Sequence, residues 1–151
     1  MPDLRKLIEE YLDSARLMQL ATAIDNQPWI CSVWYAFDQN LNIYWFSSIT
    51  RRHSQELKTN NKVAGAIVLP QQPSDPPRGL QFEGVALELN KKEDVSQARS
   101  NYQNRIFDGQ TIDQLIANPV KPHRFYQVRP AKFVLFDTVN FPDNARQELI
   151  L

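Results

Sequence analysis

The sequence is poor in the residues that mark several common protein classes. Its 151 residues include one cysteine and four glycines. A single cysteine excludes an intrachain disulfide, so nothing in the sequence implies an oxidising compartment. With so few glycines, the chain has neither a glycine-rich phosphate loop nor a nucleophile elbow. Net charge is also absent, because 17 lysines and arginines balance 17 acidic residues, and this balance argues against a nucleic-acid partner.

Long apolar runs are missing as well. No stretch approaches the roughly 18 apolar residues of a membrane span. The first segment, MPDLRKLIEEYLDSARLM, is amphipathic and carries acidic residues, whereas a signal peptide needs an unbroken apolar core. We therefore expect a cytoplasmic protein with no membrane partner. The length predicts a single domain that covers residues 1–151.

The chain is rich in short apolar strands. Helical spacing of apolar residues ends near Ala15, and the period then changes to that of strands. Strands are predicted at 18–24, 29–37, 41–47, 62–69, 78–89, 123–128 and 131–139, with Pro130 allowing a break or a bulge between the last two. Short helices are predicted at 52–61, 92–107 and 111–118. Thr111 and Gln114 fit a capping box at the start of the last helix, and Gly84 predicts a bulge or a close approach of another backbone.

The connections between these strands decide the fold class. The first three strands are joined by the short turns DNQP and DQN, which is typical of an antiparallel meander. No long crossover helices separate the strands, as a parallel sheet would require. A closed barrel also removes the exposed edges of so many apolar strands. The sequence therefore predicts a mainly β (α+β) fold, a small antiparallel barrel with short peripheral helices.

One cationic turn is the strongest local signal. In FSSITRRHSQEL, residues 46–57, an apolar strand end is followed by hydroxyl side chains and then by Arg51, Arg52 and His53 at a helix start. Cations are unfavourable at a helix N-terminus unless an anion lies there, because the helix dipole favours negative charge. Two interpretations are open. The turn binds a phosphate, or it is a solvated loop whose arginines pair with carboxylates elsewhere.

Other candidate groups carry weaker signals. Cys31 lies in an apolar strand with no base beside it, so we interpret it as a buried thiol rather than a nucleophile. His53 and His123 lack companions at ligand spacing, which predicts no metal site. The aromatic residues Trp29, Trp34, Tyr35 and Trp45 are core or interface residues, or alternatively the wall of a pocket for a flat ligand.

Residues 20–68, from LATAIDNQPW to NNKVAGAIV, resemble the flavin-binding split-barrel family of pyridoxamine 5′-phosphate oxidase. The segment RGLQFEGVALEL resembles the strand that follows in that family, and the nearest branch is the YhbP-like one, whose members have no assigned reaction. The resemblance covers about residues 4–138. It implies a six-stranded antiparallel split barrel, a homodimer, and FMN at the subunit interface.

The resemblance also assigns cofactor-binding residues. Phe46 and Ser47 match the strand end along the ribityl chain, Arg52 matches a phosphate-binding residue, and His53 stands where the oxidases carry a lysine. A charged His53 would make phosphate binding weaken as the pH rises. The backbone of the second strand would lie near the isoalloxazine ring, and the later strand adds two further candidates. The predicted set is Val33, Trp34, Tyr35, Phe46, Ser47, Ser48, Arg51, Arg52, His53, Arg78 and Gln81.

Two departures from the family limit the functional prediction. Cys31 and Ala36 stand where the oxidases have an arginine and a lysine, so the phosphate clamp is thinner. The arginine-and-histidine segment that holds the substrate phosphate in the oxidases has no match in FVLFDTVNFPDNARQELIL. We therefore predict an FMN-dependent oxidoreductase with an unassigned small-molecule substrate and no assigned catalytic residue, and not pyridoxamine phosphate oxidation. The alternatives are a non-catalytic dimer that binds or senses flavin or haem, and a split barrel that has lost its ligand.

Overall fold

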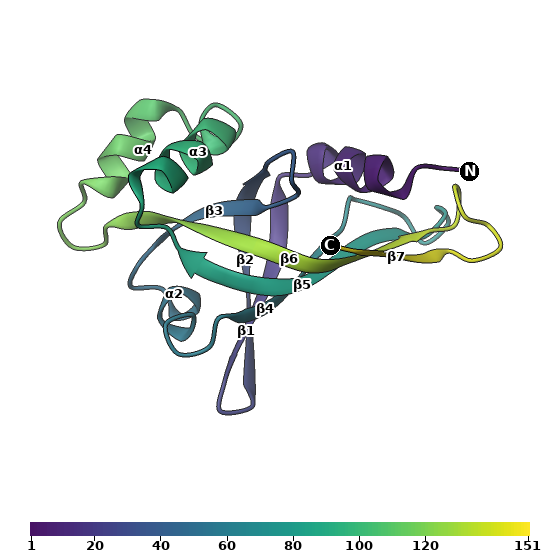
Figure 1. Ribbon diagram of the computed structural model, residues 1–151, viewed down its shortest axis with the longest axis horizontal. Coiled ribbons are helices and arrows are strands. Elements are labelled where there is room, and N and C mark those ends of the chain that lie inside the picture. The colour runs from purple at the N-terminus through teal and green to yellow at the C-terminus, as the bar shows by residue number, and fades with distance from the viewer.

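The computed structural model describes residues 1–151 and contains seven β-strands and four α-helices. The strands are β1 (Leu17–Ile24), β2 (Gln27–Phe37), β3 (Ile43–Ser48), β4 (Lys62–Ile67), β5 (Arg78–Glu88), β6 (His123–Asp137) and β7 (Arg146–Ile150). The helices are α1 (Leu4–Ser14), α2 (Arg52–Glu56), α3 (Lys92–Tyr102) and α4 (Gly109–Ile116) (Figure 1). None of the helices is both long and apolar enough to cross a membrane.

Six of the strands close into a ring. Neighbours pair in the order β3-β2-β1-β4-β5-β6-β7, and an additional pairing of β3 with β6 joins the ends of the six-stranded part. All the pairings are antiparallel. The six-stranded antiparallel barrel predicted from the sequence is therefore confirmed. β7 lies outside the ring and pairs only with the last part of β6, residues 132–136.

The turns follow from local chemistry. Asp25 and Asn26 have φ angles of 51° and 64°, as a two-residue hairpin turn requires, and asparagine and aspartate tolerate this left-handed conformation. Asp38 closes the next turn, because its carboxylate accepts the N–H groups of Asn40 and Asn42. These two turns fix the β1–β2–β3 meander and hence the position of the C-terminal end of β3.

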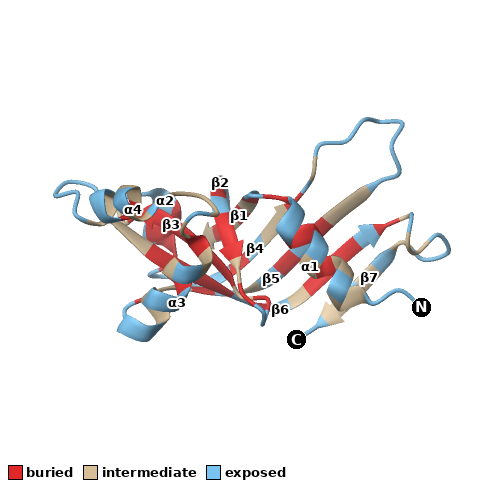
Figure 2. Ribbon diagram, turned by 90° about the horizontal axis from the view of Figure 1, so that it is seen from above, coloured by how far each residue is buried: buried red, intermediate tan, exposed pale blue.

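Two apolar clusters lie on opposite sides of β3. Trp45 faces the barrel interior, where its ring stacks on that of Tyr126 at 5.0 Å between centroids. Tyr44 and Phe46 face the other way and pack with residues of α3 and α4. Both faces are thus covered, and every residue of β3 is buried (Figure 2). β3 therefore contributes to the barrel core and, at its far end, to the surface that α3 and α4 cover.

Four sequence-based expectations were wrong in detail, and the first is helix α2, which ends at Glu56 and not near residue 61. The last two predicted strands, 123–128 and 131–139, form one continuous strand, β6, because Pro130 sits opposite Gly84 at a bulge that does not interrupt the strand. Helix α3 ends at Tyr102, not near residue 107. Helix α4 begins at Gly109, and its N-cap is Asp108, whose carboxylate accepts the Thr111 N–H, so the predicted Thr111 capping box is not formed. The sequence reading also missed β7.

The bulge predicted at Gly84 is present. The register of the β5–β6 ladder shifts between Glu83 and Gly84, where the chain passes close to the backbone of β6. A Cβ atom at position 84 would lie 2.2 Å from the carbonyl oxygen of Arg129. The glycine is therefore required by the close approach of two backbones.

Candidate functional site

A cavity of about 630 Å³ lies where β2 and β3 separate. β2 pairs with β3 only from Tyr35 to Phe37, whereas β6 pairs with β3 along its whole length, from Ile43 to Ser48. Residues 29–34 of β2 consequently have β1 on one side and no strand on the other. The free edge of β2, the end of β3, the start of α2 and the α3–α4 region enclose the space, which we call the β2–β3 cavity.

Most of the predicted cofactor residues line this cavity. They come from β2, from the end of β3 and from the turn into α2, and they are Val33, Trp34, Phe46, Ser47, Ser48, Arg51, Arg52 and His53. The structure thus brings together residues that the sequence separates by up to twenty positions. The volume of the β2–β3 cavity is within the range of small-molecule and cofactor pockets.

The turn between β3 and α2 is held rigid by its own hydroxyl groups. The Ser48 and Thr50 hydroxyls lie 2.9 Å apart, and the Ser54 hydroxyl donates to the Ser48 carbonyl at 2.8 Å. Arg51 occupies the N-cap position of α2 but its side chain makes no cap hydrogen bond. Its guanidinium forms no ion pair with any carboxylate of the chain and remains available to an external anion.

Arg52 is different, because one carboxylate of the chain is its partner. Its Nε donates to Glu56 Oε2 at 2.8 Å, and the other oxygen of the buried Glu56 accepts the Thr22 hydroxyl at 2.9 Å. The guanidinium also lies 4.1 Å from the centroid of the Trp29 ring. Both interpretations of the cationic turn therefore hold in part. Arg52 is oriented by an internal carboxylate through Nε, while neither of its Nη groups is bonded within the chain.

His53 does not supply the positive charge expected from the sequence. It is buried, and its Nε2 lies 2.9 Å from the Ser47 hydroxyl. Burial lowers the pKa of His53 below its ordinary value, and the nearby Arg51 lowers it further. The imidazole is therefore neutral at neutral pH in the ligand-free chain and serves as a hydrogen-bonding group at the cavity wall.

Acidification should destabilise the protein through His53. The folded-state pKa lies below the unfolded value of about 6.5, so its stability contribution is complete above that pH and is lost as the pH falls toward the folded-state pKa. We expect the free energy of urea unfolding to decrease between pH 7 and pH 5. His53→Gln should remove part of this dependence, and His123→Gln part of the remainder, since burial also lowers the pKa of His123. An unchanged pH profile in both variants would contradict this assignment.

The aromatic residues of β2 and β3 divide between core and cavity. Tyr35 and Trp45 are fully buried in the barrel core, whereas Trp29 and Trp34 line the cavity and are 41% and 48% exposed. Cys31 also lines it, and burial raises the pKa of its thiol to about 11, so the thiol is protonated at neutral pH. Cys31 is therefore only partly buried, not buried as predicted, while its protonated thiol agrees with the interpretation that it is not a nucleophile.

The sequence reading missed the far wall of the cavity. Tyr102, Phe107 and Leu115, from α3, α4 and the loop between them, close the cavity opposite the basic turn, and His123 lies at its edge. Apolar spacing in residues 92–116 was a signal for a packed helix pair. Nothing in that spacing indicates which strand the pair covers.

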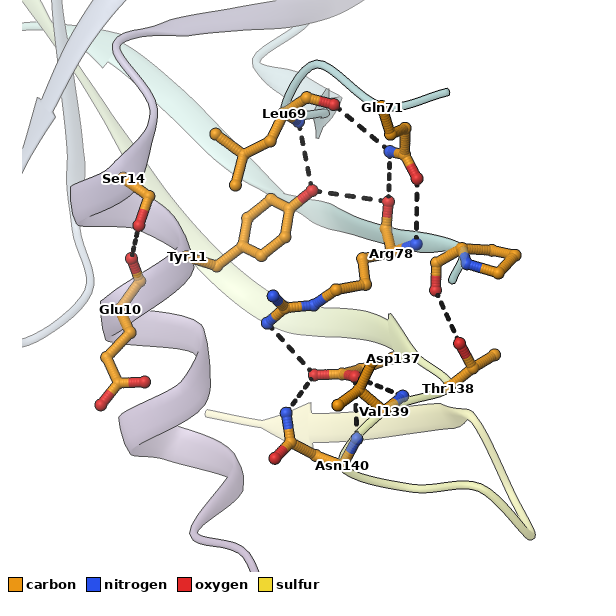
Figure 3. Close-up of polar contacts among 11 residues, drawn as sticks. Glu10, Tyr11, Ser14, Leu69, Gln71, Arg78, Asp137, Thr138, Val139 and Asn140 are labelled. Atoms are coloured by element: carbon orange, nitrogen blue, oxygen red, sulfur yellow. Dashed lines mark hydrogen bonds and ion pairs between the residues drawn. The ribbon is translucent and has the colours of Figure 1, made fainter. Parts of the chain in front are cut away.

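Three predicted residues do not reach the cavity. The Tyr35 side chain points into the core, where its hydroxyl donates to the Leu12 carbonyl. Arg78 lies at the other end of the barrel and forms an ion pair with the buried Asp137 at 3.3 Å (Figure 3). Gln81 lies in the middle of β5 and lines separate hollows on the sheet surface. Within one chain, these residues do not contribute side chains to the β2–β3 cavity.

The network around Arg78 connects α1 to the ends of β4, β5 and β6. The Arg78 backbone exchanges two hydrogen bonds with the Gln71 side chain, and the Tyr11 hydroxyl accepts the Leu69 N–H (Figure 3). Asp137 in turn accepts from the backbone N–H groups of Val139 and Asn140. The Arg78–Asp137 pair therefore ties together the ends of two strands and a turn.

Residues 4–137 match the family model described as "Pyridoxamine 5'-phosphate oxidase". "UPF0306 protein PM1958" of Pasteurella multocida is 28% identical over 113 residues, which cover 74% of each chain. Solved structures with a similar fold include a heme binding protein from Mycobacterium smegmatis (TM-score 0.78, 18% identity) and a FAD-binding protein from Mesorhizobium loti (TM-score 0.63, 20% identity). The match to the heme binding protein covers 99% of this chain and 59% of that protein. The match to the FAD-binding protein covers 85% of this chain and 89% of that protein.

Proposed function

The chain belongs to the pyridoxamine 5′-phosphate oxidase family, and from that premise we propose that it binds FMN in the β2–β3 cavity. One observation carries the proposal. An unpaired arginine and an oriented arginine line a cavity whose other walls combine serine and histidine side chains with aromatic and apolar ones. A phosphorylated ligand with a flat ring system requires this combination of charge and surface.

The residues of the cavity fit the chemical groups of FMN. Arg51 and the free Nη groups of Arg52 would neutralise the phosphate, and the hydroxyls of Ser47 and Ser48 would donate to it or to the ribityl chain. The free edge of β2 offers backbone N–H and C=O groups for the polar edge of the ring. The FAD-binding protein of similar fold supports a flavin as the ligand.

We propose further that the bound flavin serves an oxidoreductase reaction. The flavin would supply hydride or electron transfer, while the chain binds and orients it. We assign no catalytic acid or base, because the Cys31 thiol is protonated at neutral pH and the His53 imidazole is bonded to the Ser47 hydroxyl. Pyridoxamine phosphate is not the proposed substrate, because the oxidases' segment for the substrate phosphate has no match at the C-terminus.

The proposed assembly is a homodimer with the cavity at its interface. Trp29 and Trp34 are half-exposed at the open side of the cavity, and Ile30 between them is 61% exposed. A second copy that covered this edge of β2 would remove three large apolar side chains from water and close the cavity. Light scattering on the eluted protein should therefore give twice the 17.5 kDa mass of one chain, and a monomer would refute this part of the proposal.

FMN binding itself is tested by heat stability and absorption. FMN at about 100 times its dissociation constant should stabilise the fold by about 2.7 kcal/mol and raise the melting temperature by about 5–10 °C. The complex should also show flavin absorption after gel filtration. If FMN neither shifts the melting temperature nor co-elutes, the proposed function is wrong.

A second candidate is haem binding. Both histidines of the chain line the cavity, and His123 uses only Nδ1 in a contact with the Lys121 carbonyl, so Nε2 has no bond within the chain. A neutral imidazole of this kind is an axial haem ligand. The heme binding protein of similar fold from Mycobacterium smegmatis supports haem as the alternative ligand. A Soret band that appears on haem addition and is lost in His123→Ala, without any FMN response, would favour this candidate.

A further inference from the structure

The helical arm, residues 92–116, supplies the apolar wall of the cavity but has few polar bonds to the barrel. It comprises α3, α4 and the loop between them, and it packs on β2, β3 and β6 through one apolar cluster (Figure 1). Only two of its side chains donate hydrogen bonds to the rest of the chain. Gln97 contributes one at 3.4 Å, and Arg105 contributes all the others.

Arg105 inserts between the arm, α1 and β2. Its guanidinium donates to the carbonyl oxygens of Leu12 (3.0 Å), Ala15 (2.8 Å) and Tyr35 (3.3 Å), and to the Asp13 carboxylate (3.1 Å). It lies 5.7 Å from the Tyr35 ring and 5.3 Å from the Phe37 ring. The side chain is only 14% exposed.

The acceptors explain why an arginine is needed. The Leu12 and Ala15 carbonyls belong to the C-terminal turn of α1, where the last carbonyl groups have no partner within the helix. A cation is favoured there by the helix dipole. The planar guanidinium reaches several acceptors from one side chain, which the single ammonium of a lysine cannot do at the same geometry.

The loop geometry connects this contact to the cavity. Asn104 has a φ angle of 65°, and its N–H donates to the Phe107 carbonyl at 2.7 Å, which makes a tight turn around Arg105. Phe107, at the other end of that turn, lines the cavity. Arg105 and Phe107 are therefore parts of one short rigid turn. Loss of the guanidinium contacts would therefore free the turn that carries Phe107.

We propose that Arg105 is the positioning residue of the cavity's apolar wall. It fixes the helical arm against α1 and β2, and the N-terminal helix, which contributes no residue to the cavity, thereby controls how firmly the cavity is closed. The consequence for ligand retention rests on the proposed function, whereas the attachment of the arm does not.

Hydrogen–deuterium exchange on the ligand-free protein tests the attachment. Arg105→Ala should raise exchange in residues 92–116 and in the last turn of α1 by at least tenfold, the effect of losing one charge-assisted bond. Exchange in β4 and β5 should stay unchanged. Arg105→Lys, which keeps the charge, should give a smaller rise, and Lys6→Ala, which removes an exposed cation of α1 with no side-chain bond, should give none in the arm.

An equal rise in the arm and in β4 and β5, or no rise at all, would overturn the proposal. If Arg105→Ala does not fold, the same comparison with Arg105→Lys decides.

Stopped-flow FMN binding gives the second readout. Dissociation should be at least tenfold faster in Arg105→Ala with association changed less than threefold, and unchanged dissociation would disprove the link to the cavity. If the unmodified protein binds no FMN, the proposed function fails while the exchange result still judges the attachment.

Discussion

Alanine at Arg51 or at Arg52 is expected to weaken FMN binding by about 1–3 kcal/mol, the contribution of a charge-assisted hydrogen bond to a phosphate. Arg51 has no carboxylate partner in the chain, so its loss removes positive charge directly from the site. Arg52 is held by Glu56 through Nε and stacks on Trp29, which leaves its Nη groups in a fixed orientation. The double variant should lose more than either single one.

Riboflavin provides the matched ligand for this test, because it has the ring and the ribityl chain without the phosphate. In fluorescence quenching titrations, both variants should bind FMN more weakly than the unmodified protein does. Their affinity for riboflavin should be unchanged. Arg5→Ala, whose exposed ion pair with Glu9 is on α1, is the control variant and should change neither affinity. An equal loss for the two ligands would place the phosphate elsewhere, and no loss for either would remove the basis of the proposed site.

Replacement of Gly84 by alanine should destabilise the sheet strongly. A Cβ at this position would lie 2.2 Å from the Arg129 carbonyl oxygen and 2.8 Å from Pro130 Cα. Both are backbone atoms of a long central strand and cannot move aside without breaking the β5–β6 ladder. We expect Gly84→Ala to reduce the free energy of unfolding by about 3 kcal/mol or more, the upper end of overpacking effects.

Gly79 is the natural control for this substitution. It lies on the same strand, and no atom lies within 4 Å of where its Cβ would be. Gly79→Ala should therefore change the unfolding free energy by no more than about 0.5 kcal/mol. Urea unfolding followed by tryptophan fluorescence compares the two variants directly. Similar stabilities would show that the bulge can relax around a methyl group.

Local sequence patterns predicted the structure correctly where the conformation of a segment depends on its own residues. The DNQP turn, the alternation in residues 78–89 and the glycine at the bulge each reflect short-range sterics and side-chain periodicity. The same holds for the cationic turn, because its residues are adjacent in the chain. The start of α4 was misplaced because Asp108 and Thr111 are both acceptable caps, and only the observed bond from the Thr111 N–H to Asp108 decides between them.

The six barrel strands, the short turns of the first meander and the cationic turn after the third strand could be located from the amino-acid sequence, since each depends on residues within a few positions. Three features required the folded chain: the pairing of β2 with β3 at Tyr35–Phe37 alone, the bond of Arg52 to Glu56, and the orientation of Tyr35 and Arg78 away from the cavity. The physical reason is that burial, pKa and partner choice depend on groups distant in sequence. Arg105 donates to the carbonyl of Tyr35, which lies seventy residues earlier in the chain, and no local sequence pattern predicts this contact.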